Sequence, residues 1–184
     1  MKNIQNRTKL FLDSEFTGLH QNTTFISLAL VDQDNNYFYA EFNDYEKTHI
    51  DQWLETNVLD NLLFNEHKEF ILKENNSINI KNDTENILFE LNNWLLNYDS
   101  IEIWLDVLAY DWVLFCNLYG HALNIPSNIY YIPLDLSTLF YIKNIDPDTS
   151  REEFVGDVES IQKINKHNAL HDAFVIKHCV QKLL

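Results

Sequence analysis

The chain has 184 residues, of which 46% are hydrophobic and 22% are charged, and its formal net charge at pH 7 is −15. This length and apolar content suit one compact domain with a hydrophobic core, so we expect a single domain over residues 1–184. The acidic balance weighs against a protein that coats long nucleic acid, because Lys and Arg contacts to phosphates supply most of that affinity.

The first part of the chain predicts three strands in an antiparallel meander. Apolar and β-branched runs cover residues 9–15, 23–31 and 37–42, and the sequence DQDNN before the third run is a turn signal. Residues 45–82 are patterned less regularly. Within them, we interpret the polar stretch 65–82 as a short helix followed by a loop.

The second half alternates helices with strands. We expect a helix capped by Asp83, a fourth strand over residues 100–107, and an apolar helix closed by Gly120. A short strand and a short helix should follow near Asp135, and Ser150 opens a capping-box pattern that predicts another helix. The last helix runs from about Asn168 to the C-terminus. This order predicts an α/β layer fold with a mixed sheet.

The cellular setting is an expectation from composition. No apolar run approaches the length of a membrane span, so we expect a cytoplasmic protein without a membrane partner. Cys116 and Cys179 lie in apolar segments that look helical, which favours buried thiols over a disulfide.

Carboxylates occupy positions where apolar side chains would be expected. Asp13 and Glu15 share one face at the end of the first strand, where like charges repel each other and resist desolvation. Asp172 lies on the inward face of the last helix. Asp111 opens an apolar helix, where taken alone it reads more simply as a cap. Together these carboxylates suit Mg²⁺ or Mn²⁺, and a two-metal site is a known solution for phosphodiester chemistry.

The ordered pattern resembles the DEDDh 3′–5′ exonucleases, which have a ribonuclease H-like fold. DSEFTGL resembles their first motif, HNALHD resembles the third with its H-x₄-D spacing, and SIEIWLDVLAYDWVLFCNLYG resembles the second motif of a small bacterial group of DEDDh exoribonucleases. The resemblance runs from about Lys9 to Leu184 and is weakest over 65–82 and 142–166. It implies a central mixed five-stranded sheet, antiparallel over its first three strands and flanked by helices.

The resemblance also implies a mechanism. Asp13, Glu15, Asp111 and Asp172 would hold two Mg²⁺ or Mn²⁺ ions, and His167 would be the general base. The reaction would release nucleoside 5′-monophosphates from the 3′ end of single-stranded RNA or short oligonucleotides. A DNA substrate and a homodimer remain open.

Substrate contacts are implied for the turn after the first motif. Phe16, Thr17 and Leu19 would contact the terminal nucleotide, although Phe16 and Leu19 also suit an apolar core. Four basic residues precede or adjoin the third motif and either hold phosphates or are ordinary surface groups: Lys143, Arg151, Lys163 and Lys166.

Other interpretations compete with this one. His167 and His171 are four residues apart, which on one helix would suit zinc, but no H-E-x-x-H pattern accompanies them. We expect His171 on the surface or behind the metal ligands. Asp106 is a second candidate for the middle carboxylate, and otherwise a satisfied group at a strand end. The alternative function is a non-catalytic module of the same fold that binds nucleic acid or nucleotides.

Overall fold

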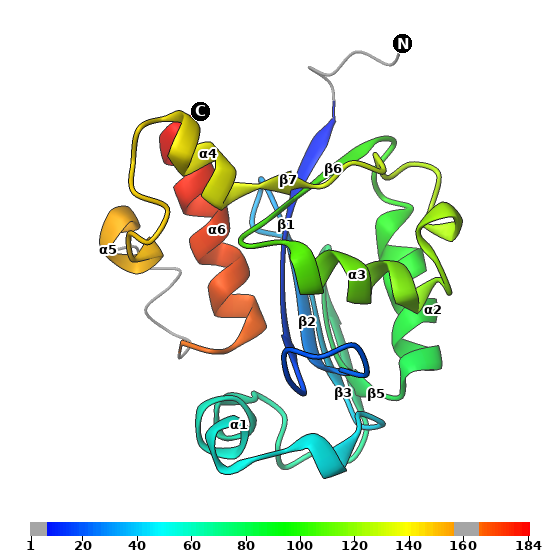
Figure 1. Cartoon of the computed structure of the whole chain (residues 1–184). Helices are drawn as coiled ribbons and strands as arrows, with labels where there is room; N and C mark the ends of the chain where they lie inside the picture. The colour runs from blue at the N-terminus through cyan, green and yellow to red at the C-terminus, as the bar shows by residue number, and fades with distance from the viewer. Residues whose placement is uncertain (1–6, 157–165) are drawn as a thin grey trace.

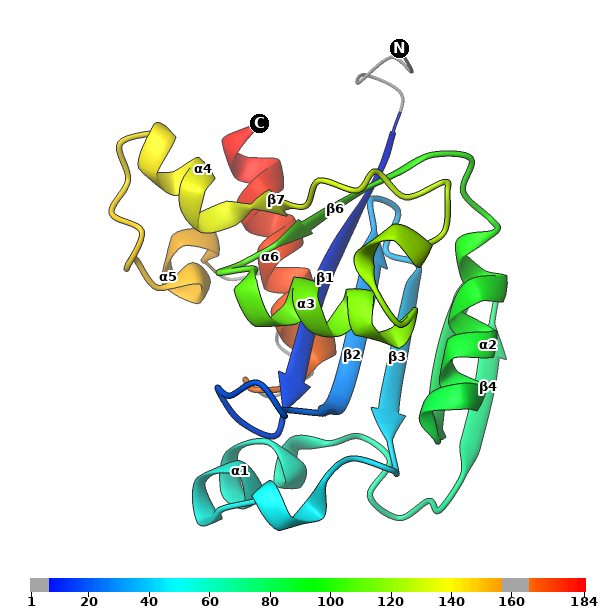
Figure 2. The same ribbon diagram turned by 45° about the vertical axis from the view of Figure 1, so that its right-hand side comes forward.

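The computed structural model describes residues 7–156 and 166–184. Within these ranges the chain forms one seven-stranded mixed sheet with helices on both faces (Figures 1 and 2). The strand order is β4-β5-β3-β2-β1-β6-β7. The strands are β1 (Thr8–Phe16), β2 (Phe25–Asp32), β3 (Tyr37–Phe42), β4 (Phe70–Glu74), β5 (Ser77–Asn82), β6 (Ile101–Leu105) and β7 (Leu134–Asp135).

The predicted α/β class and the antiparallel meander are confirmed. β1 pairs with β2 and β2 pairs with β3, both in antiparallel register. On its other side, β1 pairs in parallel with β6. The architecture is consistent with a ribonuclease H-like fold.

The strand count differs from the expected five because residues 65–82 are not a helix and a loop. β4 and β5 form a hairpin that turns at Asn75, whose φ of 52° is left-handed. β5 then pairs in parallel with β3. The hairpin could not be recognised from the polar pattern for two reasons. β4 is an exposed edge strand and needs few apolar residues, and β5 is stabilised by pairing with the distant strand β3 rather than by a strand pattern of its own.

Six α-helices surround the sheet in the described residues. They are α1 (Gln52–Asn57), α2 (Thr84–Leu95), α3 (Ala109–Leu118), α4 (Leu136–Ile142), α5 (Arg151–Val155) and α6 (Ala169–Leu183). The side chains of Asp83, Asp135 and Ser150 accept backbone N–H bonds as N-caps of α2, α4 and α5. Gly120, with φ of 82°, follows the end of α3 as expected.

The sheet separates two hydrophobic cores. Leu10 and Leu12 of β1 face α2 and α3, whereas Phe11 faces the core formed with α4 and α6. Because successive side chains of a strand alternate between faces, Asp13 and Glu15 point to the α6 side and Ser14 to the α3 side. Figure 1 shows α6 on one face of the sheet and α2 with α3 on the other.

Two further expectations can be compared with the fold. Cys116 and Cys179 are both buried free thiols, as predicted. None of the helices in the described ranges combines the length and apolarity that crossing a bilayer would require.

Candidate active site

The site forms at the carboxyl end of β1. β6 pairs with β1 only as far as Phe11 and Trp104, and the chain then leaves the sheet toward α3. Beyond that point Asp13 and Glu15 are flanked by β2 but not by β6. A place where strands separate in an α/β sheet is a common ligand-binding position.

Asp172 reaches this position from α6, and His167 reaches it from the residues just before that helix. Asp172 lies in the first turn of the helix, and its amide N–H donates to the carbonyl of Asn168 (3.1 Å). His167 precedes the helix and has a left-handed backbone with φ of 60°. One ligand atom from each of Glu15, His167 and Asp172 lies within 4.8 Å of the other two. The first and third sequence motifs therefore meet in space.

Asp111 arrives from the opposite face of the sheet. α3 begins at Ala109, so Asp111 lies within its first turn and is not the N-cap residue that it resembled in isolation. The Ser14 hydroxyl donates to Asp111 Oδ1 over 2.6 Å. This contact joins the start of α3 to the middle of the first motif.

Burial and neighbouring charges raise the pKa of all four carboxylates. Burial raises the pKa of Asp13 well above its usual value, and the charges of Asp172, Asp111 and Glu15 raise it further. Burial is also the main cause that raises the pKa of Glu15 to about 8, of Asp172 to about 7 and of Asp111 to about 6. For Asp111 the Ser14 hydrogen bond opposes the shift. At neutral pH the protein alone therefore holds protons among these groups.

The donor set fits divalent cations. Within 7–156 and 166–184, no Lys or Arg forms an ion pair with Asp13, Glu15, Asp111 or Asp172. Carboxylate oxygens without sulfur ligands suit Mg²⁺ or Mn²⁺ better than zinc. The two His-containing groups that could hold an ion include His167 or His171 but never both. Among the described residues, neither three-ligand group combines the two histidines that the zinc interpretation requires.

The carboxylate of Asp106 is hydrogen-bonded by Arg151 and Ser137. Arg151 donates to both of its oxygens, from Nε over 2.7 Å and from Nη2 over 2.9 Å, and Ser137 donates over 2.7 Å. Asp106 still lines a cavity of about 230 Å³ together with Asp13 and Asp172. It is a satisfied group at the end of β6, and Arg151 is committed to it rather than free for phosphate.

The remaining basic candidates are placed differently. Lys166 lines the same cavity, is exposed and pairs with Glu152 (Nζ–Oε1 2.9 Å). Lys143 is exposed at the end of α4 and lines neither this cavity nor the one beside Glu15. Lys163 lies outside the described residues. His171 is buried, with its Nε2 3.9 Å from Asp172 Oδ1, so of its two expected positions the surface one is wrong and the one behind Asp172 agrees with the structure.

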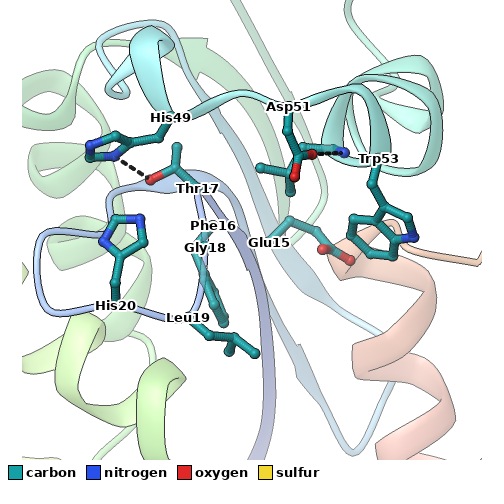
Figure 3. Close-up of a pocket in the computed structure, with 10 residues that line it drawn as sticks. Glu15, Phe16, Thr17, Gly18, Leu19, His20, His49, Asp51 and Trp53 are labelled. Carbon is teal, nitrogen blue, oxygen red and sulfur yellow. Dashed lines mark hydrogen bonds between the residues drawn. The ribbon is translucent and has the colours of Figure 1, made fainter.

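A second cavity of about 550 Å³ opens next to Glu15. Phe16, Thr17 and Leu19 all line it, as expected of substrate-contacting residues. Leu19 is 75% exposed and so is not a core residue, whereas Thr17 is buried and Phe16 is half-buried and stacks on Tyr110. Figure 3 shows these three on the turn that closes one side of the pocket.

Trp53 and His49 are among the pocket residues that were not identified from the sequence. Trp53 lies in the first turn of α1. Its ring packs edge-on with the ring of His167, and the two ring centroids are 5.4 Å apart. His49 stands across the pocket, with its Nδ1 3.5 Å from the Thr17 hydroxyl. Figure 3 shows the Glu15 carboxylate beside the Trp53 indole. An aromatic residue in an otherwise polar segment was the available signal for Trp53.

Comparison with known proteins points to one family. Residues 8–184 match the model of the 3′-5′ exoribonuclease Rv2179c-like domain. Two curated relatives from Mycobacterium tuberculosis are each 26% identical over 123 residues, which is 66% of this chain and 67% of theirs. They are the 3′-5′ exoribonuclease Rv2179c of strain H37Rv and the 3′-5′ exoribonuclease MT2234.1 of strain CDC 1551.

The raised pKa of Glu15 predicts a pH-dependent stability. A carboxyl with a folded-state pKa of about 8 and an ordinary value of 4.5 stabilises the fold at low pH, and this contribution is lost as the pH rises through 8. We expect Glu15→Gln to unfold at a higher temperature than the parent protein in EDTA at about pH 8.5, by ~2–4 °C for each kcal/mol of relieved repulsion. At about pH 4, below the ordinary value of 4.5, the two should unfold at nearly the same temperature.

Calorimetry in EDTA at both pH values measures this difference. Glu74→Gln, at an exposed position on β4, is the matched control and should leave the unfolding temperature unchanged at both pH values. Equal unfolding temperatures of Glu15→Gln and the parent protein at high pH would show that the cluster is not strained by charge.

Proposed function

The chain belongs to the Rv2179c-like 3′-5′ exoribonuclease family, and from this premise we propose that it is a DEDDh-type, metal-dependent exonuclease that removes nucleoside 5′-monophosphates from the 3′ end of single-stranded RNA. The observation that carries the proposal is the convergence of Asp13, Glu15, Asp111 and Asp172 beside His167. These residues come from three separate elements and the loop before α6.

The four carboxylates are the proposed ligands of two Mg²⁺ or Mn²⁺ ions. When bound, such ions supply an activated water and stabilise the negative charge on the phosphate and on the leaving 3′-oxygen. The raised pKa values of the carboxyls support this assignment, because bound cations would offset the same desolvation and repulsion that protons offset in the protein alone. The hydrogen bond from Ser14 restrains the Asp111 carboxylate.

His167 is the proposed general base. Burial and the charge of Lys166 lower its pKa below the ordinary value, so the imidazole is neutral and able to accept a proton at pH 7. Its ring lies beside Glu15 and Asp172, where the attacking water would be held. The ring of Trp53 also packs edge-on with the His167 ring.

The pocket beside Glu15 is the proposed site of the terminal nucleotide. Leu19 and Trp53 expose apolar surface on opposite sides of a 550 Å³ cavity, which suits a planar base. A nucleotide seated there has its 5′ phosphate directed to the carboxylates, so the cut removes one nucleotide from the 3′ end. The formal charge of −15 favours a short contact with RNA over wrapping of a long strand.

Shortening of labelled RNA tests the proposed activity. With 5′-labelled single-stranded RNA and Mg²⁺ or Mn²⁺, we expect a ladder that shortens from the 3′ end and stops in EDTA. Asp13→Asn should slow it by roughly 10³-fold, because a central ligand is lost. Asp60→Asn, an exposed position after α1, is the control. Binding of RNA without shortening would instead identify a non-catalytic module, and parallel DNA reactions measure the sugar preference.

His167→Ala should separate catalysis from metal binding. We expect kcat to fall by ~10²–10⁴-fold, while Mn²⁺ titration gives an affinity within about twofold of the parent. In the parent, kcat should decline as the pH falls through the lowered pKa of His167. His121→Ala, an exposed histidine after α3, should leave kcat unchanged. Full activity of His167→Ala would exclude His167 as the base.

Trp53→Ala tests the nucleotide pocket. Loss of a stacking surface should raise KM by about 5- to 100-fold, measured with an RNA oligonucleotide under steady-state conditions. Phe89→Ala removes an aromatic ring of similar exposure from the outer side of α2 and should leave KM unchanged. An unchanged KM for Trp53→Ala would place the terminal base elsewhere.

A further inference from the structure

On the face of the sheet that α6 covers, the protein buries a further carboxylate that is separate from the four carboxylates of the site. Glu41 of β3 has no exposed surface. Its Oε1 accepts hydrogen bonds from the Tyr39 hydroxyl (2.9 Å) and from the backbone N–H groups of Leu63 (2.7 Å) and Phe64 (3.0 Å). Lys81 Nζ lies 3.3 Å from Oε2. Glu41 therefore anchors the loop after α1 to the sheet.

The Tyr39 hydroxyl connects Glu41 to Asn168, the residue that caps α6. It donates to Glu41 and accepts from Asn168 Nδ2 over 3.1 Å. Burial and the Glu41 charge raise the pKa of Tyr39 above its ordinary value, so the hydroxyl stays protonated as the donor. The direction of both hydrogen bonds is thereby defined.

Asn168 uses its whole side chain. Its Oδ1 accepts the N–H of Leu170 as the N-cap of α6, and its Nδ2 donates to Tyr39 and to the carbonyl of Asn61 (2.9 Å). Asn168 is completely buried. Helix capping uses only the side-chain oxygen of Asn168. The side-chain NH₂ group therefore contributes separately, by joining the start of α6 to Tyr39 and Asn61.

Asn61 also forms a hydrogen bond to the residue that precedes His167. Its Nδ2 donates to the carbonyl of Lys166 over 3.1 Å, while its own carbonyl accepts from Asn168. Residues on both sides of His167 are thus tied to one residue of the loop that Glu41 anchors. His167 itself has a φ of 60°, a conformation that a non-glycine residue keeps only where its surroundings enforce it.

We propose that Tyr39, Asn61 and Asn168, anchored by Glu41, are positioning residues that hold His167 in its left-handed conformation and so aim its ring at the site. This inference rests on the proposed role of His167 as the base. None of the positioning residues lines either of the two cavities of the site. They act on the reaction only through the backbone of residues 166–168.

Tyr39→Phe is the central test, because it removes one hydroxyl and no carbon. Tyr37→Phe is the matched control: it lies on the same strand, its hydroxyl also accepts from an amide, that of Asn79 (3.2 Å), and no hydrogen bond within the described residues joins that hydroxyl to residues 166–168. We expect Tyr39→Phe to lower kcat by ~10-fold with KM within about twofold, since small misplacements of a catalytic group are costly. Tyr37→Phe should keep the kcat of the parent.

Two further readouts separate positioning from a general loss of stability. The NMR resonances of the His167 ring, assigned with His167→Ala, should shift in Tyr39→Phe and stay in place in Tyr37→Phe. In the His167→Ala background, Tyr39→Phe should cause no further loss of kcat. Asn168→Ser, which keeps a capping oxygen but lacks the amide donors, should reproduce both results.

The outcomes are distinct. Ring resonances that do not move in either Tyr39→Phe or Asn168→Ser, or an equal loss of kcat with and without His167, would overturn the positioning role. If the parent protein failed to shorten RNA, the proposed function would fail, but the ring resonances would still decide whether this network sets the position of His167.

Discussion

Repulsion among carboxylates in a desolvated pocket is the constraint on which this site depends. Asp13 is half-buried beside Glu15, Asp111 and Asp172, and desolvation together with the charge of each of them raises its pKa. A fold accepts such a cluster only if protons or cations offset the charge, and the described residues supply no lysine or arginine pair for it. The stability that the cluster costs comes from the two hydrophobic cores on either side of the sheet.

The sheet brings the carboxylates together by two simple features of β1. Alternation sends Asp13 and Glu15 toward α6, and the early departure of β6 leaves the end of β1 open to α3. Helices on opposite faces can therefore contribute to one site, as Asp172 and Asp111 do (Figure 2). The Ser14–Asp111 hydrogen bond shows how closely the α3 side approaches, because Ser14 points away from its two acidic neighbours.

Local patterns predicted much of this arrangement. The three apolar runs of the meander, the caps at Asp83, Asp135 and Ser150, and the inward face of α6 are short-range signals, and all are confirmed. The β4–β5 hairpin was missed because its partner β3 lies more than thirty residues earlier in the chain. Arg151 likewise has a role that no local pattern carries, since Asp106 is far away in sequence.

The sequence by itself determined which residues we propose for the chemistry, because Asp13, Glu15, Asp111, His167 and Asp172 and the strand and helix periods around them can be read from the chain. Only the tertiary structure decided how they are aimed. The hydrogen bonds of Asn61 and Asn168 on either side of His167, the Ser14 contact to Asp111 and the pocket beneath Trp53 all join residues distant along the chain. Such contacts follow from packing of the whole domain, which no single window of sequence contains.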